Sequence, residues 1–209
     1  GVAMFYNQDI LDEAGVEVPK TWDDMLAAAP KIAAIGKYAL TGNLASEPPS
    51  QITYEVWPLI LQAGGNLLQD GKPAFNSPAG VAALEYLKKL YDGEKFMTPG
   101  ALAATETQKR ENFVAGNTAF MFDSPAGINI VRKGNPDLKF GTAPMPAGVK
   151  SGTVMQGTQL TLSAQSKVKD KAWKFLAWVS SAEGSEKWAS SLGFFPSNSK
   201  AQEASFVAD

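Results

Sequence analysis

Acidic side chains are the abundant groups in this sequence that could act in acid–base chemistry, because its 209 residues include no histidine and no cysteine. The lack of histidine removes the most frequent general base, and the lack of cysteine removes thiolate nucleophiles, disulfides and thiolate metal ligands. Carboxylates near the start of the chain could be considered as an acid–base pair for glycoside hydrolysis: Asp9, Asp12, Glu13, Asp23 and Asp24. We favour solvated helix faces for all of them, since Asp23 and Asp24 fall where a helix dipole stabilises negative charge.

Metal and cofactor chemistry is not indicated either. The acidic residues Glu47, Glu106 and Asp123 show no metal-ligand spacing. Gly64 and Gly65 follow an apolar helical pattern and are read as a helix end rather than as a phosphate-binding loop. We therefore expect no metal and no cofactor.

Two aromatic residues carry the most informative chemistry. Tyr54 and Trp57 are three residues apart, on one face of a predicted helix, just after a loop that contains Pro48 and Pro49. Sugars present flat, CH-rich faces that stack on such rings, while their hydroxyls bond to a few well-placed polar groups. The alternative for Trp57 is a place in the core.

Polar residues follow two predicted strands and could supply those polar groups. The first set lies on the loop after the strand at residues 37–41: Asn43, Glu47 and Gln51. The second set follows the apolar run at residues 118–122: Asp123 and Ser124. In open α/β sheets, loops at strand ends line the ligand crevice. Asp123 could accept hydrogens from two sugar hydroxyls, and either residue of the second set could instead cap the next helix.

The first 36 residues predict a strand followed by two helices. Asn7 is a candidate N-cap of the first helix, and Gly15 can take the left-handed conformation that ends it. Thr21 with Asp24 three residues later predicts a capping box at the start of the second helix.

The middle of the chain alternates helices and strands. We expect a helix over residues 51–63, kinked at Pro58, and a hairpin with Asp70 and Gly71 in its turn. Another helix should begin at Ser77 and bury four residues: Val81, Leu84, Leu87 and Leu90.

The second half continues the alternation. It predicts a helix at residues 106–115, a strand buried on both faces at 118–122 and a strand at 138–143. Residues 152–162 should be an extended pair or one long strand, and residues 166–181 an amphipathic helix. That helix should bury four residues: Ala172, Phe175, Leu176 and Val179. This order predicts an α/β fold with helices around a mostly parallel sheet. Trp173, Trp178 and Trp188 are read as packing residues of late helices.

Composition narrows the function classes. The net charge is −2 and no basic block is present, which argues against nucleic-acid binding. No apolar run approaches the length needed to span a membrane. Residues 1–5 begin inside an apparent strand, so we expect the chain to be a piece of a larger protein.

Three stretches resemble family 1 extracellular solute-binding proteins, the maltose-binding-protein-like receptors of ABC importers. They are PKTWDD at residues 19–24, FVAGNTAFMFDSPAG at 113–127 and KAWKFL at 171–176. The resemblance extends over essentially the whole chain. It implies a periplasmic-binding-protein-like second lobe at residues 1–143, a hinge-crossing segment at 144–165 and a helical return segment at 166–209, with the first lobe largely absent.

The resemblance also implies a function and its residues. Such a receptor binds a small-molecule solute, which the resemblance implies is a carbohydrate, between two lobes and delivers it to ABC permease membrane subunits without catalysis. Tyr54 and Trp57 match an aromatic pair at the cleft, and Asp123 and Ser124 match positions that face it. Where the maltose-binding type has a stacking tryptophan, this chain has Ala126 and Gly127, so a smaller or differently placed ligand is expected. The location implied is periplasmic, or extracellular with a lipid anchor.

Two alternatives from other classes stay open at this point. The chain could belong to a carbohydrate-active enzyme, which a hydrolysis assay would reveal. It could also be a self-associating fragment, because residues 1–5 and 144–162 are apolar or β-prone and could form a homodimer through exposed strand edges.

Overall fold

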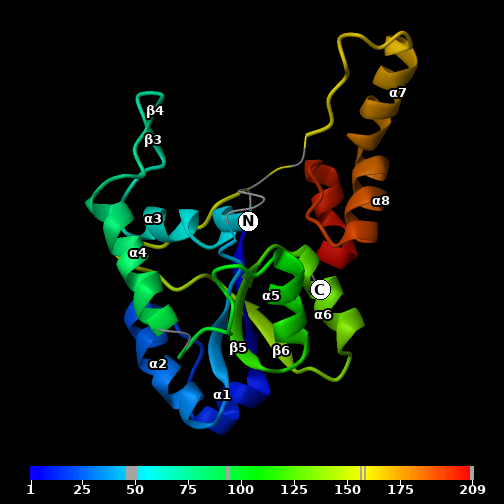
Figure 1. The fold of residues 1–209 in the computed structure, drawn as a ribbon. Helices are drawn as coiled ribbons and strands as arrows, with labels where there is room; N and C mark the ends of the chain where they lie inside the picture. Colours follow the sequence, from blue (N-terminus) through cyan, green and yellow to red (C-terminus); the bar gives the residue numbers. More distant parts are fainter. Residues whose placement is uncertain (46–50, 93–94, 156, 158, 208–209) are drawn as a thin grey trace. The chain divides into compact units, whose positions relative to one another are not determined.

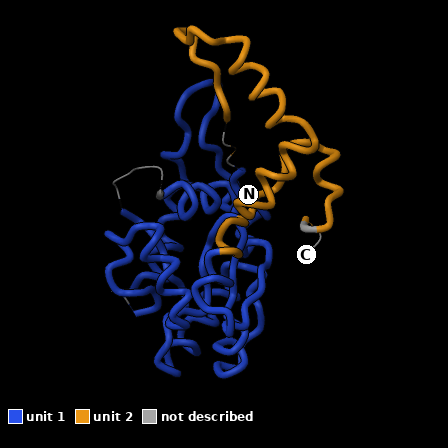
Figure 2. The backbone as a smooth tube through the Cα atoms, turned by 90° about the vertical axis from the view of Figure 1, so that its right-hand side faces the viewer, with its two compact units in different colours: residues 1–124, 130–155 blue, residues 125–129, 156–209 orange. Residues whose placement is uncertain are grey.

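The computed structural model describes residues 1–45, 51–92, 95–155, 157 and 159–207. The chain forms two compact units (Figure 2). Unit 1 comprises Gly1–Ser124 and Ile130–Met155, and unit 2 comprises Pro125–Asn129 and Gln156–Asp209. All the residues of the candidate functional site described below lie in unit 1.

The first elements form as their local sequence predicts. Strand β1 (Ala3–Asn7) leads directly into helix α1 (Gln8–Ala14), where the Asn7 side chain accepts a hydrogen bond from the Ile10 N–H. Gly15 ends this helix at a φ of 61°. Helix α2 (Trp22–Ala34) starts with the complete capping box of Thr21 and Asp24. These caps confirm the predicted helix starts.

A four-stranded sheet forms the centre of unit 1 (Figure 1). Its strands are β1, β2 (Tyr38–Thr41), β5 (Thr118–Asp123) and β6 (Phe140–Ala143), in the order β2-β5-β1-β6. Strands β2 and β5 are parallel, whereas β1 pairs antiparallel with both β5 and β6. The α/β class is confirmed, but the sheet is mixed rather than mostly parallel, because β1 runs opposite to both of its neighbours.

The core lies on both faces of this sheet. All six residues of β5 are buried, as the apolar run predicts. Phe5 of β1 stacks on Phe140 of β6 with ring centroids 6.1 Å apart, and Phe113 packs edge-on against both rings. Helix α2 contacts β2, and helix α5 (Glu106–Val114) contacts both β2 and β5. This packing fixes α5 against the strand ends that carry the site.

The predicted helix at residues 51–63 is wrong in its first half. The structure has a short 3₁₀ helix, η1 (Gln51–Tyr54), and a separate helix α3 (Trp57–Gln62). Pro58 lies in the first turn of α3, where its missing N–H costs no hydrogen bond, so the proline begins a helix and does not kink one.

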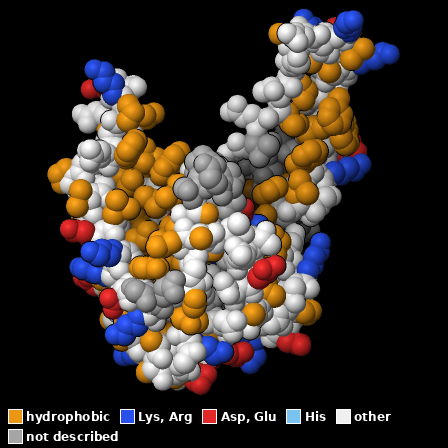
Figure 3. Space-filling view, in the orientation of Figure 1, with side chains coloured by type: hydrophobic (Ala, Val, Ile, Leu, Met, Phe, Trp, Pro, Cys, Tyr) orange, Lys and Arg blue, Asp and Glu red, His pale blue; other side chains and the backbone are white. Residues whose placement is uncertain are grey.

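The predicted hairpin and the helix after it are both present, but the buried face of the helix differs from the prediction. Strands β3 (Leu68–Gln69) and β4 (Lys72–Pro73) flank Asp70 and Gly71, both at positive φ. Helix α4 (Pro78–Tyr91) begins at the Ser77 cap, but Val81 and Leu84 are 52% and 55% exposed. Leu87 and Leu90 are buried as predicted, but Ala83 and Tyr86 are buried in place of Val81 and Leu84, because a face rotated from the predicted one meets the core. Hydrophobic side chains gather over α3, α4 and the hairpin in Figure 3.

The expected strand at residues 152–162 is absent from the part of this segment that the structure describes. A strand requires a pairing partner, and the described residues offer this segment none. Residues 147–153, which belong to unit 1, instead attach to the rest of that unit through individual hydrogen bonds. Ala147 exchanges backbone hydrogen bonds with Lys20 and Trp22, and the Thr153 hydroxyl bonds to both the N–H and the carbonyl of Val2.

A buried glutamine completes this attachment. Trp22 Nε1 donates to Gln62 Oε1 over 2.8 Å, and Gln62 Nε2 donates to the Gly152 carbonyl over 2.7 Å. The Trp22 ring stacks on Tyr86 at 4.3 Å between centroids. Gln62 is completely buried, so its amide bridges helix α3, helix α2 and the segment that follows β6.

Unit 2 is helical. Helix α6 (Ala126–Gly134) begins in it and continues into unit 1, and it also contains α7 (Lys169–Val179), α8 (Ala182–Leu192), η3 (Ser199–Glu203) and η4 (Ser205–Val207). Of the four residues expected to be buried on α7, Val179 is buried, Ala172 and Leu176 are partly buried and Phe175 is 54% exposed. Trp173, Trp178 and Trp188 are also exposed.

The division of the chain into a lobe, a hinge-crossing segment and a return segment at residues 143 and 165 stays a prediction.

None of the helices in the described ranges is both long and apolar enough to cross a membrane.

Candidate functional site

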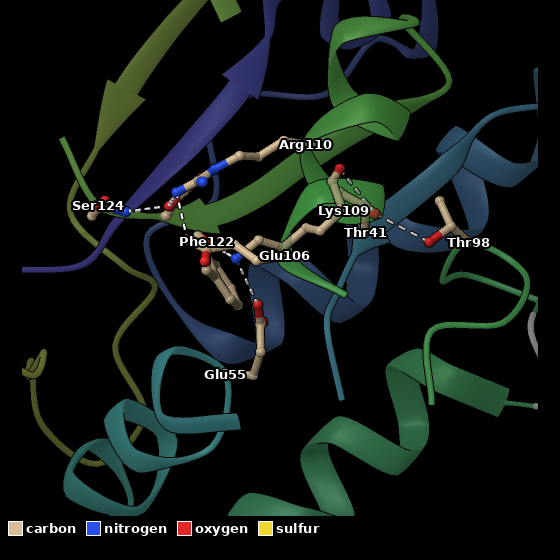
Figure 4. Close-up of polar contacts among 9 residues, drawn as sticks. Thr41, Glu55, Thr98, Glu106, Lys109, Arg110, Phe122 and Ser124 are labelled. Atoms are coloured by element: carbon tan, nitrogen blue, oxygen red, sulfur yellow. Dashed lines mark hydrogen bonds and ion pairs between the residues drawn. The ribbon is translucent and has the colours of Figure 1, made fainter. Parts of the chain in front are cut away.

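The candidate site lies where the parallel strands β2 and β5 end. Thr41 closes β2 and Asp123 closes β5, and the register places Thr41 beside Met121. The carboxyl ends of parallel neighbours meet at one edge of a sheet, which is the usual location of a ligand crevice. Five charged residues gather there and are called the charge cluster: Glu55, Glu106, Lys109, Arg110 and Asp123 (Figure 4).

Asp123 is held by Arg110 in a two-bond ion pair. Arg110 Nε donates to Oδ2 over 2.6 Å and Nη2 donates to Oδ1 over 2.8 Å. The N–H of Ser124 also donates to Oδ1, over 2.7 Å, and the Asp123 side chain is completely buried. Arg110 makes a further ion pair with Glu106 one turn earlier on α5. Both carboxylate oxygens of Asp123 therefore already accept hydrogen bonds from the protein.

A second ion pair lies deeper. Lys109 Nζ is 3.1 Å from Glu55 Oε1, and the two side chains are 0% and 1% exposed. The same ammonium donates to the Phe122 carbonyl over 2.6 Å. Burial raises the pKa of Glu55, and the charge of Lys109 opposes that rise. The pair joins the segment between η1 and α3 to the end of β5.

Two hydroxyls extend the polar contacts behind Lys109. Thr98 Oγ1 donates to Thr41 Oγ1 over 3.2 Å, and the Thr41 hydroxyl donates to the Lys109 carbonyl over 3.4 Å. All three residues are buried. This chain of bonds ties helix α5 to the end of β2 as well as to β5.

Tyr54 lies beside the charge cluster. The Lys109 ammonium is 5.9 Å from the centre of its ring. Burial raises the pKa of the Tyr54 phenol, and the negative charges of Glu106 and Asp123 raise it further. The ring is partly exposed, so a half-covered aromatic face adjoins fixed charges.

Trp57 lies outside the core, with 40% of its surface exposed, so the core alternative for this residue is wrong. The helix expected to carry both rings is interrupted, and Tyr54 ends η1 while Trp57 begins α3. The structure therefore places the Tyr54 ring near Lys109 of the charge cluster, whereas Trp57 lies on a different helix.

The other predicted site residues are placed as follows. Asn43 is buried just after β2, Gln51 is the first residue of η1, and Ser124 is partly exposed just after β5. Glu47 lies outside the described residues. That any of the seven residues binds a ligand stays a prediction.

Sequence reasoning missed Glu55, Lys109 and Arg110. Charged residues on a helix are normally read as a solvated face, and a fully buried lysine is rare unless it is paired. The one available signal was the spacing of Glu106 and Arg110, which places opposite charges on the same helix face. In the described part of the chain, no group of three or more acidic side chains could hold a metal ion.

Comparisons with known proteins agree with this architecture. A family model described as bacterial extracellular solute-binding protein matches residues 1–209. The arabinooligosaccharide-binding protein of Bacillus subtilis is 30% identical over 203 residues, which cover 92% of this chain and 46% of that protein.

Two solved structures are also similar. An ABC transporter solute-binding protein from Thermotoga lettingae, bound to α-D-tagatose, has a TM-score of 0.85 at 26% identity and is covered to 55% by the whole of this chain. The GacH receptor of Streptomyces glaucescens, solved without ligand and with acarbose, has a TM-score of 0.78 at 27% identity and is covered to 53%. The chain thus spans about half the length of the relatives that it matches. Because the family model matches it from residue 1 to residue 209, this chain belongs to the bacterial extracellular solute-binding proteins.

Proposed function

We propose that the protein captures a sugar or sugar-like solute in a cleft between two lobes and delivers it to the membrane permease of an ABC importer. The observation that carries the proposal is the partly exposed Tyr54 ring next to the charge cluster at the ends of β2 and β5. An aromatic face beside fixed hydrogen-bonding groups is the combination that sugar recognition needs. A similar protein named for arabinooligosaccharide binding and two similar proteins solved with α-D-tagatose and with acarbose support the same class of ligand.

We propose that residues 1–143 supply one wall of the cleft and that closure of the lobes about a hinge completes it. Tyr54, Trp57, Asn43, Glu47, Gln51, Asp123 and Ser124 are the residues proposed to form that wall. Asp123 would act through Arg110, because its own oxygens are already bonded. The permease subunits are the proposed partners, and the proposed location is periplasmic or lipid-anchored on the outside of the cell.

We propose that no reaction is catalysed. The sequence has no histidine, and the buried carboxylates Glu55 and Asp123 are each paired with a cation, which leaves neither of them as a base in contact with a substrate. A hydrolysis assay on arabino- and malto-oligosaccharides tests this point. Release of shorter sugars, lost when Asp123 is replaced by Asn, would support a carbohydrate-active enzyme instead.

The central test is calorimetry of the full-length protein with a panel of neutral sugars: arabinotriose, maltotriose and D-tagatose. At least one should bind with a Kd near the micromolar range, which corresponds to about 8 kcal/mol. Failure of the whole panel, with the protein shown to be folded by circular dichroism, would refute a sugar receptor.

A homodimer through residues 1–5 and 144–162 is a separate proposal. Leu160 and Met155 are exposed, which favours it, whereas Val2 and Val154 are buried in the core of unit 1. Light scattering over a wide range of concentrations tests it. A monomer at high concentration would mean that these segments are sufficiently covered within one chain.

A further inference from the structure

Arg110 has hydrogen-bonding capacity that the protein does not use. A guanidinium carries five N–H donors. Nε and Nη2 bond to the two oxygens of Asp123, and Nη2 also meets Glu106. Nη1 pairs with no acceptor in the described ranges and is not among their fully buried unpaired atoms, so its two hydrogens are unpaired and the atom is at least partly accessible to solvent.

The guanidinium is held in a fixed orientation. Two parallel bonds to a completely buried carboxylate set its plane, and 17% of the Arg110 side chain is exposed. The phenol of Tyr54 lies within the electrostatic reach of Arg110, Glu106 and Asp123. A rigid guanidinium therefore belongs to the same charge cluster as Lys109, whose ammonium is 5.9 Å from the centre of the partly exposed Tyr54 ring, and a ligand that bonds to Nη1 need not order a flexible side chain.

The charges around Arg110 disfavour an anionic ligand. Lys109 and Glu55 neutralise each other in the interior. Arg110 is opposed by two carboxylates, Asp123 and Glu106, which leaves this part of the charge cluster with one excess negative charge. A carboxylate or phosphate on the ligand would be repelled, whereas a hydroxyl can accept from Nη1 at no such cost.

We propose that Arg110 contacts the solute directly, donating both Nη1 hydrogens to hydroxyls of an uncharged sugar, and that Glu106 and Asp123 make the site reject sugar acids. This assignment rests on the proposed function and specifies the charge of its ligand. Arg110 is the selecting donor, Asp123 positions it, and Glu106 supplies the repulsion.

The test measures two affinities by calorimetry on the full-length protein. The first is for the neutral sugar that binds best among arabinotriose, maltotriose and D-tagatose. The second is for the same sugar with one primary hydroxyl oxidised to a carboxylate. The wild-type protein should bind the acid at least about ten-fold more weakly, as expected for a like charge brought close to an excess carboxylate.

Two variants separate contact from structural support. Arg110→Lys keeps the charge opposite Asp123 but loses the planar fork, and should weaken neutral-sugar binding by about ten-fold or more. Glu106→Gln keeps the side-chain shape and should raise the ratio of acid to neutral affinity by about three- to ten-fold. Arg132→Lys is the matched control, since Arg132 lies exposed in the last turn of α6, and it should change neither value.

The outcomes are distinguishable. If no neutral sugar and no acid binds the wild-type protein, the proposed function itself fails. If a neutral sugar binds and folded Arg110→Lys binds it with unchanged affinity, Arg110 has only a structural role and the inference is overturned. If the acid binds as tightly as the neutral sugar, the charge argument is overturned. Should Arg110→Lys fail to fold, the affinity ratio of Glu106→Gln decides alone, and an unchanged ratio overturns the inference.

Discussion

Lys109→Met should destabilise unit 1 strongly, because it leaves the Glu55 carboxylate buried without its cation. The two charges are 3.1 Å apart and at most 1% exposed. At an effective dielectric constant of about 20, this separation corresponds to an attraction of about 5 kcal/mol. Removing one partner of a buried pair generally costs about 3–5 kcal/mol. Methionine nearly matches lysine in length, so the loss should be electrostatic and should include the bond to the Phe122 carbonyl.

The loss should depend on pH in a definite direction. Burial raises the pKa of Glu55 above its ordinary value of 4.5. A carboxyl whose folded-state pKa is raised binds its proton more tightly in the folded state, so its contribution to stability is complete below pH 4.5 and is lost as the pH rises through the folded-state value. Removing Lys109 raises that pKa further, because the opposing charge is gone. Lys109→Met should therefore cost clearly less at pH 4, where only the lost bond to the Phe122 carbonyl remains, than at pH 7, where the unpaired carboxylate adds to it.

Urea unfolding of the wild type and the variant at both pH values measures these free energies. Lys139→Met is the matched control, because Lys139 is also 3.1 Å from its partner Asp9 but the two side chains are 74% and 56% exposed. It should cost less than about 1 kcal/mol. The double variant Lys109→Met with Glu55→Gln should recover part of the loss. Two results would show that the pair does not act as a buried ion pair. One is a free energy of unfolding of Lys109→Met within about 1 kcal/mol of the wild-type value at pH 7, and the other is a loss at pH 4 as large as the loss at pH 7.

Three further predictions concern single side chains of unit 1. Tyr54→Ala should weaken sugar binding by about 1–3 kcal/mol while the melting temperature barely changes, because the ring is partly exposed. A large drop in Tm with an unchanged calorimetric affinity would instead assign Tyr54 to the core. Tyr86→Phe should leave the urea midpoint unchanged or raise it, because the buried Tyr86 hydroxyl has no hydrogen-bond partner in the described part of the chain. A decrease of more than about 1 kcal/mol in the free energy of unfolding would show that the hydroxyl does have a partner. Gln62→Leu should destabilise by about 1–3 kcal/mol, since it strands the Trp22 indole N–H and the Gly152 carbonyl, and a neutral result in urea unfolding would contradict the bridging role.

Local chemistry explains which parts of the fold could be predicted from the sequence. The Asn7 and Thr21 caps depend on contacts three residues away and form as predicted. The buried run of β5 follows from its continuous apolar sequence. The sequence alone does not show whether residues 152–162 have a neighbouring strand to pair with, so the strand expected there was wrong in the described part of the segment. The direction of β1 in the sheet likewise depends on β5 and β6, which lie far along the chain.

The candidate site was predictable only in part for the same reason. Tyr54 could be singled out because it follows a proline-containing loop, and Asp123 because it follows the apolar run of a predicted strand. Lys109 and Glu55 lie 54 positions apart in sequence, and neither residue's surroundings reveal the other. A buried lysine looks like a surface lysine until the opposite charge is in place, so ion pairs of this kind emerge only from the folded structure.

The attachment of Gly152 to Trp22 has an optical consequence. The indole N–H is bonded to Gln62, and the same amide holds the Gly152 carbonyl, while the indole face stacks on Tyr86. The emission wavelength of an indole shifts with the polarity around it, so a displacement of residues 147–152 that releases Gln62 would shift the fluorescence of Trp22. The four other tryptophans are each at least 40% exposed, and replacing them with phenylalanine would leave Trp22 as a single intrinsic fluorophore. The protein would then report the state of this segment in solution without an added dye.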